Sequence, residues 1–296
     1  MKILLLGKGG QVGWELQRSL SVLGQVTALD FDSKDHCGDF SNPQGVAETV
    51  RALRPDVIVN AAAHTAVDKA ESEPELARLL NATTPGLVAE EAAKLGAWMI
   101  HYSTDYVFDG SGEQAWSEAD ATGPLSVYGS TKLEGEALIR ASGAKHLILR
   151  TSWVYAARGG NFAKTMLRLA QERDRLTVIN DQFGAPTGAD LLADVTAHAI
   201  RHLQHKPEDA GLYHCVAGGT TTWCEYAKFV ISEAQKIKPE LQIKATEVAP
   251  VPTSAFPTPA QRPHNSRLDT SRLQSTFGLT LPHWEHGVQR MLTEIL

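Results

Sequence analysis

The 296-residue chain has few cysteines, no long apolar run and no excess of positive charge. Its three cysteines (Cys37, Cys215 and Cys224) form no even disulfide framework, so we expect a reducing, cytoplasmic compartment. No apolar stretch approaches the roughly 20 residues that a membrane-spanning helix needs. The opening segment Met1–Leu6 is too short for a signal peptide and is typical of a strand. A net charge of −6 argues against a nucleic-acid or anionic-membrane partner.

Metal-binding motifs are also scarce. His198 and His202 have helical spacing, but no glutamate follows His198 as a zinc-protease helix would require. The pair His214-Cys215 has no second close pair at zinc-ligand spacing. Solvated or packed histidines are therefore the simpler interpretation. We find no internal repeat and no low-complexity tract.

Short apolar runs alternate with longer amphipathic segments in the first half, which is typical of βαβ units. The expected strands are Lys2–Leu6, Gln25–Leu29, Val57–Asn60, Trp98–Tyr102 and His146–Arg150. The expected helices are Gly13–Leu23, Asn42–Leu53, Glu75–Leu95 and Val127–Ser142. This series predicts a Rossmann-type α/β fold, a doubly wound parallel sheet with helices on both faces.

The periodicity becomes less regular after about Thr151, which predicts a smaller α+β lobe at the C-terminal side. The stretch Ala249–Pro263 contains five prolines and is predicted to be a loop. The helices expected in this half lie within Gly159–Leu169, Ala189–Leu203 and Trp284–Leu296. We expect residues 1–151, with 188–212 returning to them, to form the dinucleotide-binding domain. Residues 152–187 and 213–296 would form the substrate lobe.

A glycine-rich turn joins the first expected strand to the first helix. Gly7, Gly10 and Gly13 give G-x-x-G-x-x-G, a spacing variant of the dinucleotide fingerprint. Without β-carbons the backbone can turn sharply and approach a pyrophosphate, which the helix N-terminus attracts. The last glycine permits close packing of the helix on the strand. Such a turn can be only a turn, but its position between strand and helix favours a nucleotide.

Asp30 closes the second expected strand about 20 residues after the loop, where an acidic side chain usually binds the adenosine ribose. Alternatively, it is the N-cap of a following turn. A carboxylate there would repel a 2′-phosphate and so favours NADH. Lys8 and Lys34 are close enough in sequence to weaken that preference, and the choice between NADH and NADPH stays open.

Tyr128 and Lys132 are spaced to share one face of a helix. A free tyrosine has a pKa near ~10 and is a poor acid or base at neutral pH. A neighbouring ammonium favours the phenolate and would bring that pKa toward the working range. The hydroxyl of Thr104 could make a second hydrogen bond to the same substrate oxygen. The spacing alone also matches any solvated helix face, but the glycine-rich turn favours carbonyl reduction.

With these residues identified, the chain resembles the extended short-chain dehydrogenases/reductases over essentially its whole length. More narrowly, it is similar to the dTDP-4-dehydrorhamnose reductase family. The narrower resemblance rests on Ser103–Phe108 (Ser-Thr-Asp-Tyr-Val-Phe) and Arg150–Tyr155 (Arg-Thr-Ser-Trp-Val-Tyr). Further matching stretches are Gly7–Leu20, Gly38–Ser41, Asn60–Glu71, Tyr128–Glu136, Asp181–Thr187 and Arg262–Ser266.

The resemblance implies an activity. NAD(P)H would reduce the C4 ketone of dTDP-4-dehydro-β-L-rhamnose (dTDP-6-deoxy-β-L-lyxo-4-hexulose) to dTDP-β-L-rhamnose. This is the last step of dTDP-L-rhamnose synthesis, which supplies lipopolysaccharide O-antigen. Tyr128 would protonate the carbonyl oxygen, and Thr104 would bond the developing alkoxide. Lys132 would tune Tyr128 and bond the nicotinamide ribose.

The same resemblance assigns binding residues. Gly10, Gln11 and Val12 would surround the pyrophosphate, and Asp30 would contact the ribose. The other implied cofactor contacts are Asp39, Phe40, Ala63, His64, Thr65 and Tyr102. Thr104 and Asp105 would hold the sugar, and Trp153 would form one wall of its pocket. From the residues alone, Phe40 and Trp153 could be apolar core positions, and Asp68-Lys69 a surface pair.

Family members are described as magnesium-dependent, with acidic residues near a dimer interface. Glu15, Asp190 and Glu294 match that pattern, although Asp190 is shorter than the expected glutamate. A homodimer with a magnesium ion is therefore expected, and ordinary solvated carboxylates are the alternative. Arg262 is expected either to bind the substrate diphosphate, since its fork matches phosphate oxygens, or to form a structural ion pair. The segment Asn161-Phe162 would help to complete the sugar pocket.

Two other functions stay open. A nucleotide-sugar epimerase or dehydratase on the same fold would retain NAD+, and a dehydratase typically needs an Asp-Glu pair after the threonine. Here Asp105-Tyr106 follows Thr104, so that pair is absent. A non-catalytic regulatory subunit, like that of methionine adenosyltransferase, is the other alternative. The presence of Tyr128, Lys132 and Thr104 argues against it.

Overall fold

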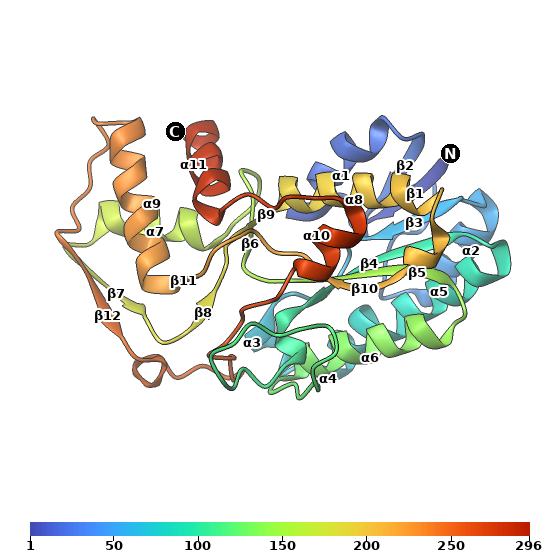
Figure 1. The fold of residues 1–296 in the computed structure, drawn as a ribbon, viewed down its shortest axis with the longest axis horizontal. Helices are drawn as coiled ribbons and strands as arrows, with labels where there is room; N and C mark the ends of the chain where they lie inside the picture. Colours follow the sequence, from blue (N-terminus) through green and yellow to red (C-terminus); the bar gives the residue numbers. More distant parts are fainter.

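A six-stranded, all-parallel sheet organises one half of the molecule, as the computed structural model of residues 1–296 shows (Figure 1). In spatial order its strands are β10 (Gly211–His214), β5 (Lys145–Thr151), β4 (Trp98–Thr104), β3 (Val57–Asn60), β1 (Lys2–Leu6) and β2 (Gln25–Leu29). The chain reverses its direction of travel across the sheet between β1 and β3, which in such folds opens a crevice at the carboxyl ends of the strands. The predicted fold class is confirmed, and β10 is a strand that the periodicity did not predict.

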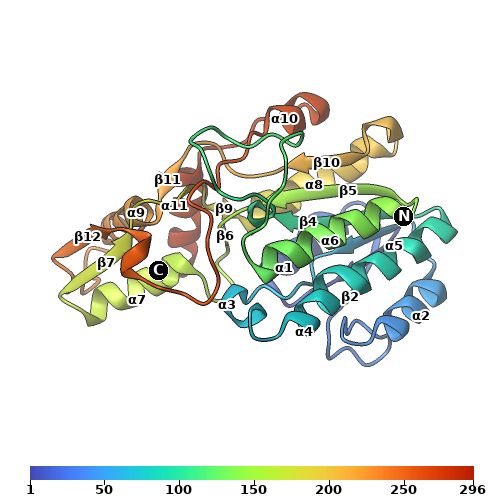
Figure 2. The ribbon, with the colours of Figure 1, turned by 90° about the horizontal axis from the view of Figure 1, so that it is seen from below.

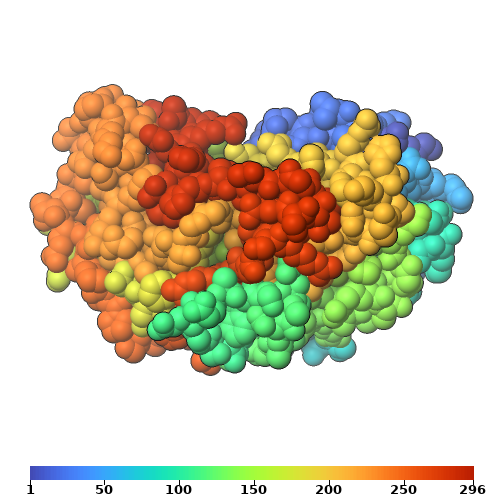
Figure 3. All heavy atoms as spheres, viewed as in Figure 1, coloured from blue at the N-terminus to red at the C-terminus, as the bar shows by residue number.

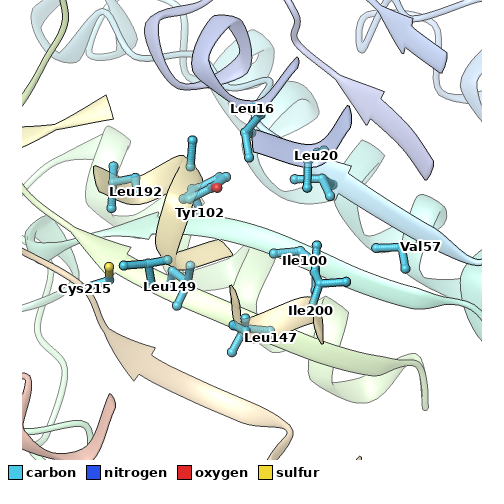
Figure 4. Packing of buried hydrophobic residues seen from close by; sticks show 14 of the residues in the cluster. Leu16, Leu20, Val57, Ile100, Tyr102, Leu147, Leu149, Leu192, Ile200 and Cys215 are labelled. Carbon is cyan, nitrogen blue, oxygen red and sulfur yellow. The ribbon is translucent and has the colours of Figure 1, made fainter. Parts of the chain in front are cut away.

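Helices cover both faces of this sheet (Figure 2). On one face α1 (Gln11–Ser21) and α8 (Ala189–Leu203) contribute Leu16, Leu20 and Leu192 to a core with Ile100 of β4 (Figure 4). On the other face lie α2 (Pro43–Leu53), α5 (Thr84–Leu95) and α6 (Val127–Ala141). The continuous apolar runs of β1 and β3 are explained by this double coverage, because both sides of each strand are buried.

The helix predicted over Glu75–Leu95 is interrupted in the structure. It consists of α4 (Pro74–Arg78), a π-helical turn at Leu79–Thr83 and α5. The short helix α3 (Val67–Ala70) precedes it. The π turn places Asn81 inward, where its side chain accepts the backbone N–H of His64 and donates to Thr131 of α6. Turns of this kind are frequent near functional sites.

The other half is built from α7 (Phe162–Glu172), α9 (Trp223–Ile237) and α11 (Trp284–Ile295) with short strand pairs. The pairs are β7 (Arg175–Ile179) with β12 (Glu247–Val251), β8 (Phe183–Gly184) with β11 (Thr221–Thr222), and β6 (Val154–Tyr155) with β9 (Thr187–Gly188). The loop prediction for Ala249–Pro263 is wrong at its start, where β12 runs to Val251. Pro250 is tolerated because β12 pairs on one side only.

The end of the chain bridges the two halves. The short helix α10 (Ser271–Phe277) packs on the sheet half through Leu273 and Phe277, whereas α11 packs on α9. Figure 3 shows this C-terminal stretch in red across the middle of one face. None of the helices combines the length and the apolar character needed to cross a membrane.

Candidate active site

A cavity of about 880 Å³ lies at the carboxyl ends of the sheet strands, between the two halves. Most predicted site residues line it. They are Gly7, Gly10, Gln11, Val12, Asp30, Asp39, Phe40, Ala63, Thr65, Tyr102, Thr104, Asp105, Tyr128, Lys132 and Trp153. Gly13 and His64 do not line this cavity, and Glu15, Asp190 and Glu294 surround a different one.

The glycine-rich turn has the close packing that its sequence predicts. Gly7 has a φ of +89°, and a β-carbon there would overlap the backbone of Ala62, just after β3. A β-carbon on Gly13 would overlap the carbonyl oxygen of Gly7, so Gly13 serves packing and not the cavity lining. No side chain caps the N-terminus of α1 at Gly10. The free N–H groups of this helix terminus therefore suit a pyrophosphate.

Asp30 follows β2 and lies over the same turn. Its Oδ2 accepts the backbone N–H of Gly9 at 2.8 Å, and its Oδ1 accepts that of Phe31 at 3.0 Å. These bonds fix the carboxylate at the cavity edge, where it can accept hydrogen bonds from ribose hydroxyls. Three buried hydroxyls of the lining, on Ser103, Thr151 and Ser152, have no partner in the protein. Together with the turn, they fit a dinucleotide with polar groups on both its ribose and nicotinamide parts.

Helix α6 carries Tyr128 and Lys132. Ser126 caps it by accepting the N–H of Gly129 at 3.2 Å, which places Tyr128 in the first turn. Gly129 is required there, since a β-carbon would overlap the carbonyl oxygen of Tyr106. The ring of Tyr128 meets that of Tyr106 edge-on, with centroids 5.5 Å apart.

The electrostatics of Tyr128 differ from the expectation. Burial raises its pKa to about 12, and a hydrogen bond with Thr104 opposes this rise only in part. The amine of Lys132 is directed to the carbonyl oxygen of Tyr102, to which it donates at 2.5 Å. Burial therefore raises the Tyr128 pKa, where the helical spacing predicted that Lys132 would lower it. A fully protonated phenol is nevertheless the form that a proton donor needs.

Thr104 and Asp105 form a buried pair beside Tyr128. The hydroxyl of Thr104 accepts the backbone N–H of Tyr106 at 3.2 Å and donates to Oδ1 of Asp105 at 3.0 Å. Burial raises the pKa of Asp105 to about 6, against hydrogen bonds from Ser266 and Thr104 that lower it. A hydroxyl has a single proton, so Thr104 must release Asp105 before it can donate to a substrate oxygen.

Trp153 forms a wall of the cavity, and its partner Trp223 was not predicted. The two indoles stack with centroids 3.6 Å apart and an interplanar angle of 16°. Trp153 has a φ of +48°, and a β-carbon at Gly184 would overlap its ring. Phe162 continues the aromatic surface, 4.6 Å from Trp223. Sequence periodicity gave no signal for Trp223, nor for Tyr106, because only the tertiary fold brings these rings to the cavity.

Two side chains that were predicted to contact the cofactor, those of His64 and Tyr102, have their polar partners elsewhere in the protein. His64 is buried against Glu73, 3.6 Å from its carboxylate. The hydroxyl of Tyr102 is directed to α8, 2.6 Å from that of Thr196. Asn161 caps α7 and donates to the side chain of Gln11 at 3.2 Å, which ties the second half to the glycine-rich turn.

Arg262 does not line the cavity. It forms a forked ion pair with Asp68, with N–O distances of 2.8 and 3.1 Å. The structural alternative for Arg262 is therefore the one realised in this structure. Asp68 in turn is not paired with Lys69, which contacts Glu73 at 3.1 Å.

The expected magnesium ligands surround a separate cavity of about 370 Å³. Asp190 is paired with Arg290 at 3.0 Å, and Glu15 with Arg18 at 3.5 Å. Carboxylate oxygens suit magnesium, but no three acidic, histidine or cysteine side chains of the chain come close enough to hold a metal ion. A single copy of the chain therefore does not fit the expected metal, and no catalytic step is derived through it.

Comparison with known proteins identifies the family to which the chain belongs. The family model described as RmlD substrate binding domain matches residues 1–296. The chain is 67% identical over 295 residues to a dTDP-4-dehydrorhamnose reductase of Salmonella typhimurium, covering 100% of this chain and 98% of that protein. The chain belongs to the dTDP-4-dehydrorhamnose reductase family. The Escherichia coli K12 member is 64% identical over 295 residues, with the same coverage.

Solved structures extend the likeness to three dimensions. A dTDP-4-dehydrorhamnose reductase of Bacillus anthracis in complex with NADP superposes with a TM-score of 0.87 at 33% identity, covering 99% of each chain. A UDP-glucose 4-epimerase of Thermus thermophilus in complex with NAD has a TM-score of 0.79 at 19% identity, covering 100% of this chain and 99% of that one. The second likeness shows the fold alone.

Proposed function

We propose that the chain reduces the C4 ketone of dTDP-4-dehydro-β-L-rhamnose to give dTDP-β-L-rhamnose. The observation that carries this proposal is the convergence of Tyr128, Lys132 and Thr104 on one cavity with a dinucleotide turn at one end and an aromatic wall at the other. Sequence identities of 67% and 64% over the full length to reductases of this name support this choice of substrate. The epimerase, dehydratase and regulatory-subunit alternatives have no comparable support.

Held by the glycine-rich turn and Asp30, NAD(P)H would supply the hydride. Tyr128 protonates the carbonyl oxygen as negative charge develops on it, since its high pKa keeps the phenol protonated at neutral pH. Thr104 turns from Asp105 to bond the same oxygen. Lys132 orients the nicotinamide ribose, and Asp105 and Trp153 hold the sugar. Asp30 favours NADH, whereas the NADP complex of the Bacillus anthracis relative supports NADPH, so we propose that both cofactors are accepted.

An assay that follows absorbance at 340 nm tests the reaction. We expect oxidation of NADH and NADPH only when the 4-keto sugar nucleotide is present, with dTDP-rhamnose as the product identified by mass spectrometry. Protein that is isolated with tightly bound NAD+ and interconverts dTDP-sugars without added cofactor would instead be an epimerase. No oxidation with either cofactor would leave the regulatory-subunit alternative.

We also propose a cytoplasmic homodimer. All three cysteines are unpaired, which suits a reducing compartment. The rim of the second cavity includes the exposed ring of Trp14, which lies 4.0 Å from the guanidinium of Arg158, and such a surface suits a partner. A magnesium ion would need carboxylates from a second copy. Light scattering measures the mass of the assembly, and a fall in that mass on addition of EDTA would show that a metal ion holds the two copies together.

A further inference from the structure

A buried polar chain lies behind Lys132, away from the cavity. It consists of Asn60 on β3 and His101 on β4, which are register partners in the sheet. Both side chains are almost fully buried, with 1% and 0% exposed. Nδ2 of Asn60 lies 3.0 Å from Nδ1 of His101, and Nε2 of His101 lies 3.2 Å from Nζ of Lys132. Neither residue has a role in the reduction described above.

The orientation of the Asn60 amide is fixed. Its Oδ1 accepts the backbone N–H of Ala62 at 2.9 Å, so its Nδ2 must face His101. An amide nitrogen only donates, and Nδ1 of His101 must therefore accept. A neutral imidazole that accepts at Nδ1 carries its proton on Nε2. Turning the amide over would lose the bond to Ala62 and leave a buried N–H unpaired.

This tautomer conflicts with a charged lysine. The Nε2–H of His101 points at Nζ of Lys132, and an ammonium has three donors and no acceptor. An uncharged amine has a lone pair and can accept this N–H while it still donates to the carbonyl oxygen of Tyr102. The hydrogen bonds of the buried chain are therefore all satisfied only when Lys132 is uncharged.

Burial of Lys132 acts in favour of this assignment, and the nearest carboxylate acts against it. Burial lowers the pKa of Lys132 to about 8, and the carboxylate of Glu136 on the same helix opposes this. Glu136 itself is held by Arg150 of β5 at 2.7 and 2.8 Å. Burial and then the charge of Lys132 lower the pKa of His101 well below its ordinary value, so the ring stays neutral. Tyr128 lies one turn before Lys132 and Glu136 one turn after it, and these are the other ionisable groups on that face of α6.

We propose that His101 is a positioning residue: with its tautomer fixed by Asn60, it holds the amine of Lys132 against the Tyr102 carbonyl and favours the uncharged form. This rests on the proposed function only through the role of Lys132.

Two substitutions reverse the hydrogen-bond pattern without large changes in shape. In Asn60→Asp, one carboxylate oxygen keeps the bond to Ala62 and the other accepts from Nδ1–H of His101, which leaves Nε2 free to accept from an ammonium. In His101→Gln, the amide oxygen can accept from Lys132 directly. We expect both variants to raise the pKa of Lys132 by about 1 pH unit or more.

The measurement is an NMR titration of the Cε resonance in protein labelled with ¹³C-lysine, without substrate, with Lys132→Met used to assign the signal. His146→Gln is the matched control, because His146 lies on β5 outside the cavity and outside this chain. It should leave the titration of Lys132 unchanged. The alkaline limb of the kcat/KM profile should move with the NMR value.

Asn60→Asp also adds a negative charge, and the double variant Asn60→Asp with His101→Phe separates that effect. If the pKa of Lys132 rises less in the double variant than in Asn60→Asp, the result supports control through the tautomer. An equal rise overturns it. An unchanged Lys132 titration in folded His101→Gln protein also overturns the proposal, and that variant decides if Asn60→Asp does not fold. Because the titration needs no sugar substrate, its outcome is independent of whether the wild-type protein reduces the keto sugar.

Discussion

The two walls of the cavity are built in opposite ways. The wall on the sheet side consists of buried polar groups that hydrogen bond to one another or to groups behind the wall: Thr104 to Asp105, and Lys132 to the Tyr102 carbonyl and to His101 behind it. The wall on the other side is the stacked pair of Trp153 and Trp223, which Phe162 supports from behind, with no hydrogen bond between these rings. In the proposed reaction the first wall fixes the positions of protons, and the second contacts the sugar ring.

The difference indicates where each wall can tolerate change. A buried polar network loses much when one member is removed, because the partner is left unpaired. A stacked pair loses only its own contact, about 0.5–1.5 kcal/mol beyond the area that it buries. Substitutions on the sheet side should therefore alter chemistry or stability strongly, and substitutions on the aromatic side should alter substrate binding mildly.

The largest expected effect is on turnover. Replacing Tyr128 with Phe removes the proton donor but keeps the ring that packs on Tyr106, so kcat should fall by about 10²–10⁴. Steady-state kinetics with the keto sugar measures this, and binding of the substrate by calorimetry should be nearly unchanged. Turnover at the wild-type rate would remove Tyr128 from the proposed role.

The next effect is on stability and depends on pH. Burial raises the pKa of Asp105 to about 6, above the ordinary 3.8, so between these values the folded state binds more protons than the unfolded state. The free energy of unfolding contributed by Asp105 therefore falls as the pH rises through this interval. Asn cannot ionise, and Asp105→Asn should be more stable than wild type above pH 6 by up to about 3 kcal/mol.

Urea unfolding between pH 4.5 and 7.5 follows that difference. The difference in the free energy of unfolding between Asp105→Asn and wild type should grow with pH up to about 6 and then stay constant. Asp109→Asn is the matched control, since Asp109 is exposed and hydrogen bonds from Ser111 lower the pKa of its carboxyl. A difference for Asp105→Asn that shrinks as the pH rises would contradict the assigned burial penalty.

The smallest effect concerns the aromatic wall. Replacing Trp223 with Leu keeps an apolar side chain but removes the stack on Trp153, so the KM for the sugar nucleotide should rise about 2- to 10-fold. The value of kcat should change little, because no proton donor is touched. Phe229→Leu, on the same helix but packed against Trp284, should leave KM unchanged. A large fall in kcat for Trp223→Leu would show that the two walls are not independent.

The sheet half was largely predictable from sequence. The bounds of β1, β2 and β3 coincide with the predicted ones. For β1 and β3 the reason is that strands buried on both faces appear as continuous apolar runs. The glycine-rich turn was also predictable, since its spacing has a steric cause that the structure shows at Gly7 and Gly13.

The other half was less predictable. Strands such as β8 and β11 are two residues long, too short for any period to appear. Trp223 reaches the cavity only because α9 begins beside β8, which is a tertiary relation with no local pattern. The contacts of Asn60 and His101 behind Lys132 have no local sequence signal, for the same reason. These three residues are successively 41 and 31 residues apart, and only strand register and helix packing bring them together.

The stacked indoles of Trp153 and Trp223 also give the chain a natural optical reporter. Two chromophores 3.6 Å apart share their electronic excitation, so the pair should contribute a distinctive band to the near-ultraviolet circular dichroism. A ligand that slides between them or rotates one ring would change that band. Occupancy of the cavity beside these indoles can therefore be followed in unlabelled protein, and in variants that no longer turn over.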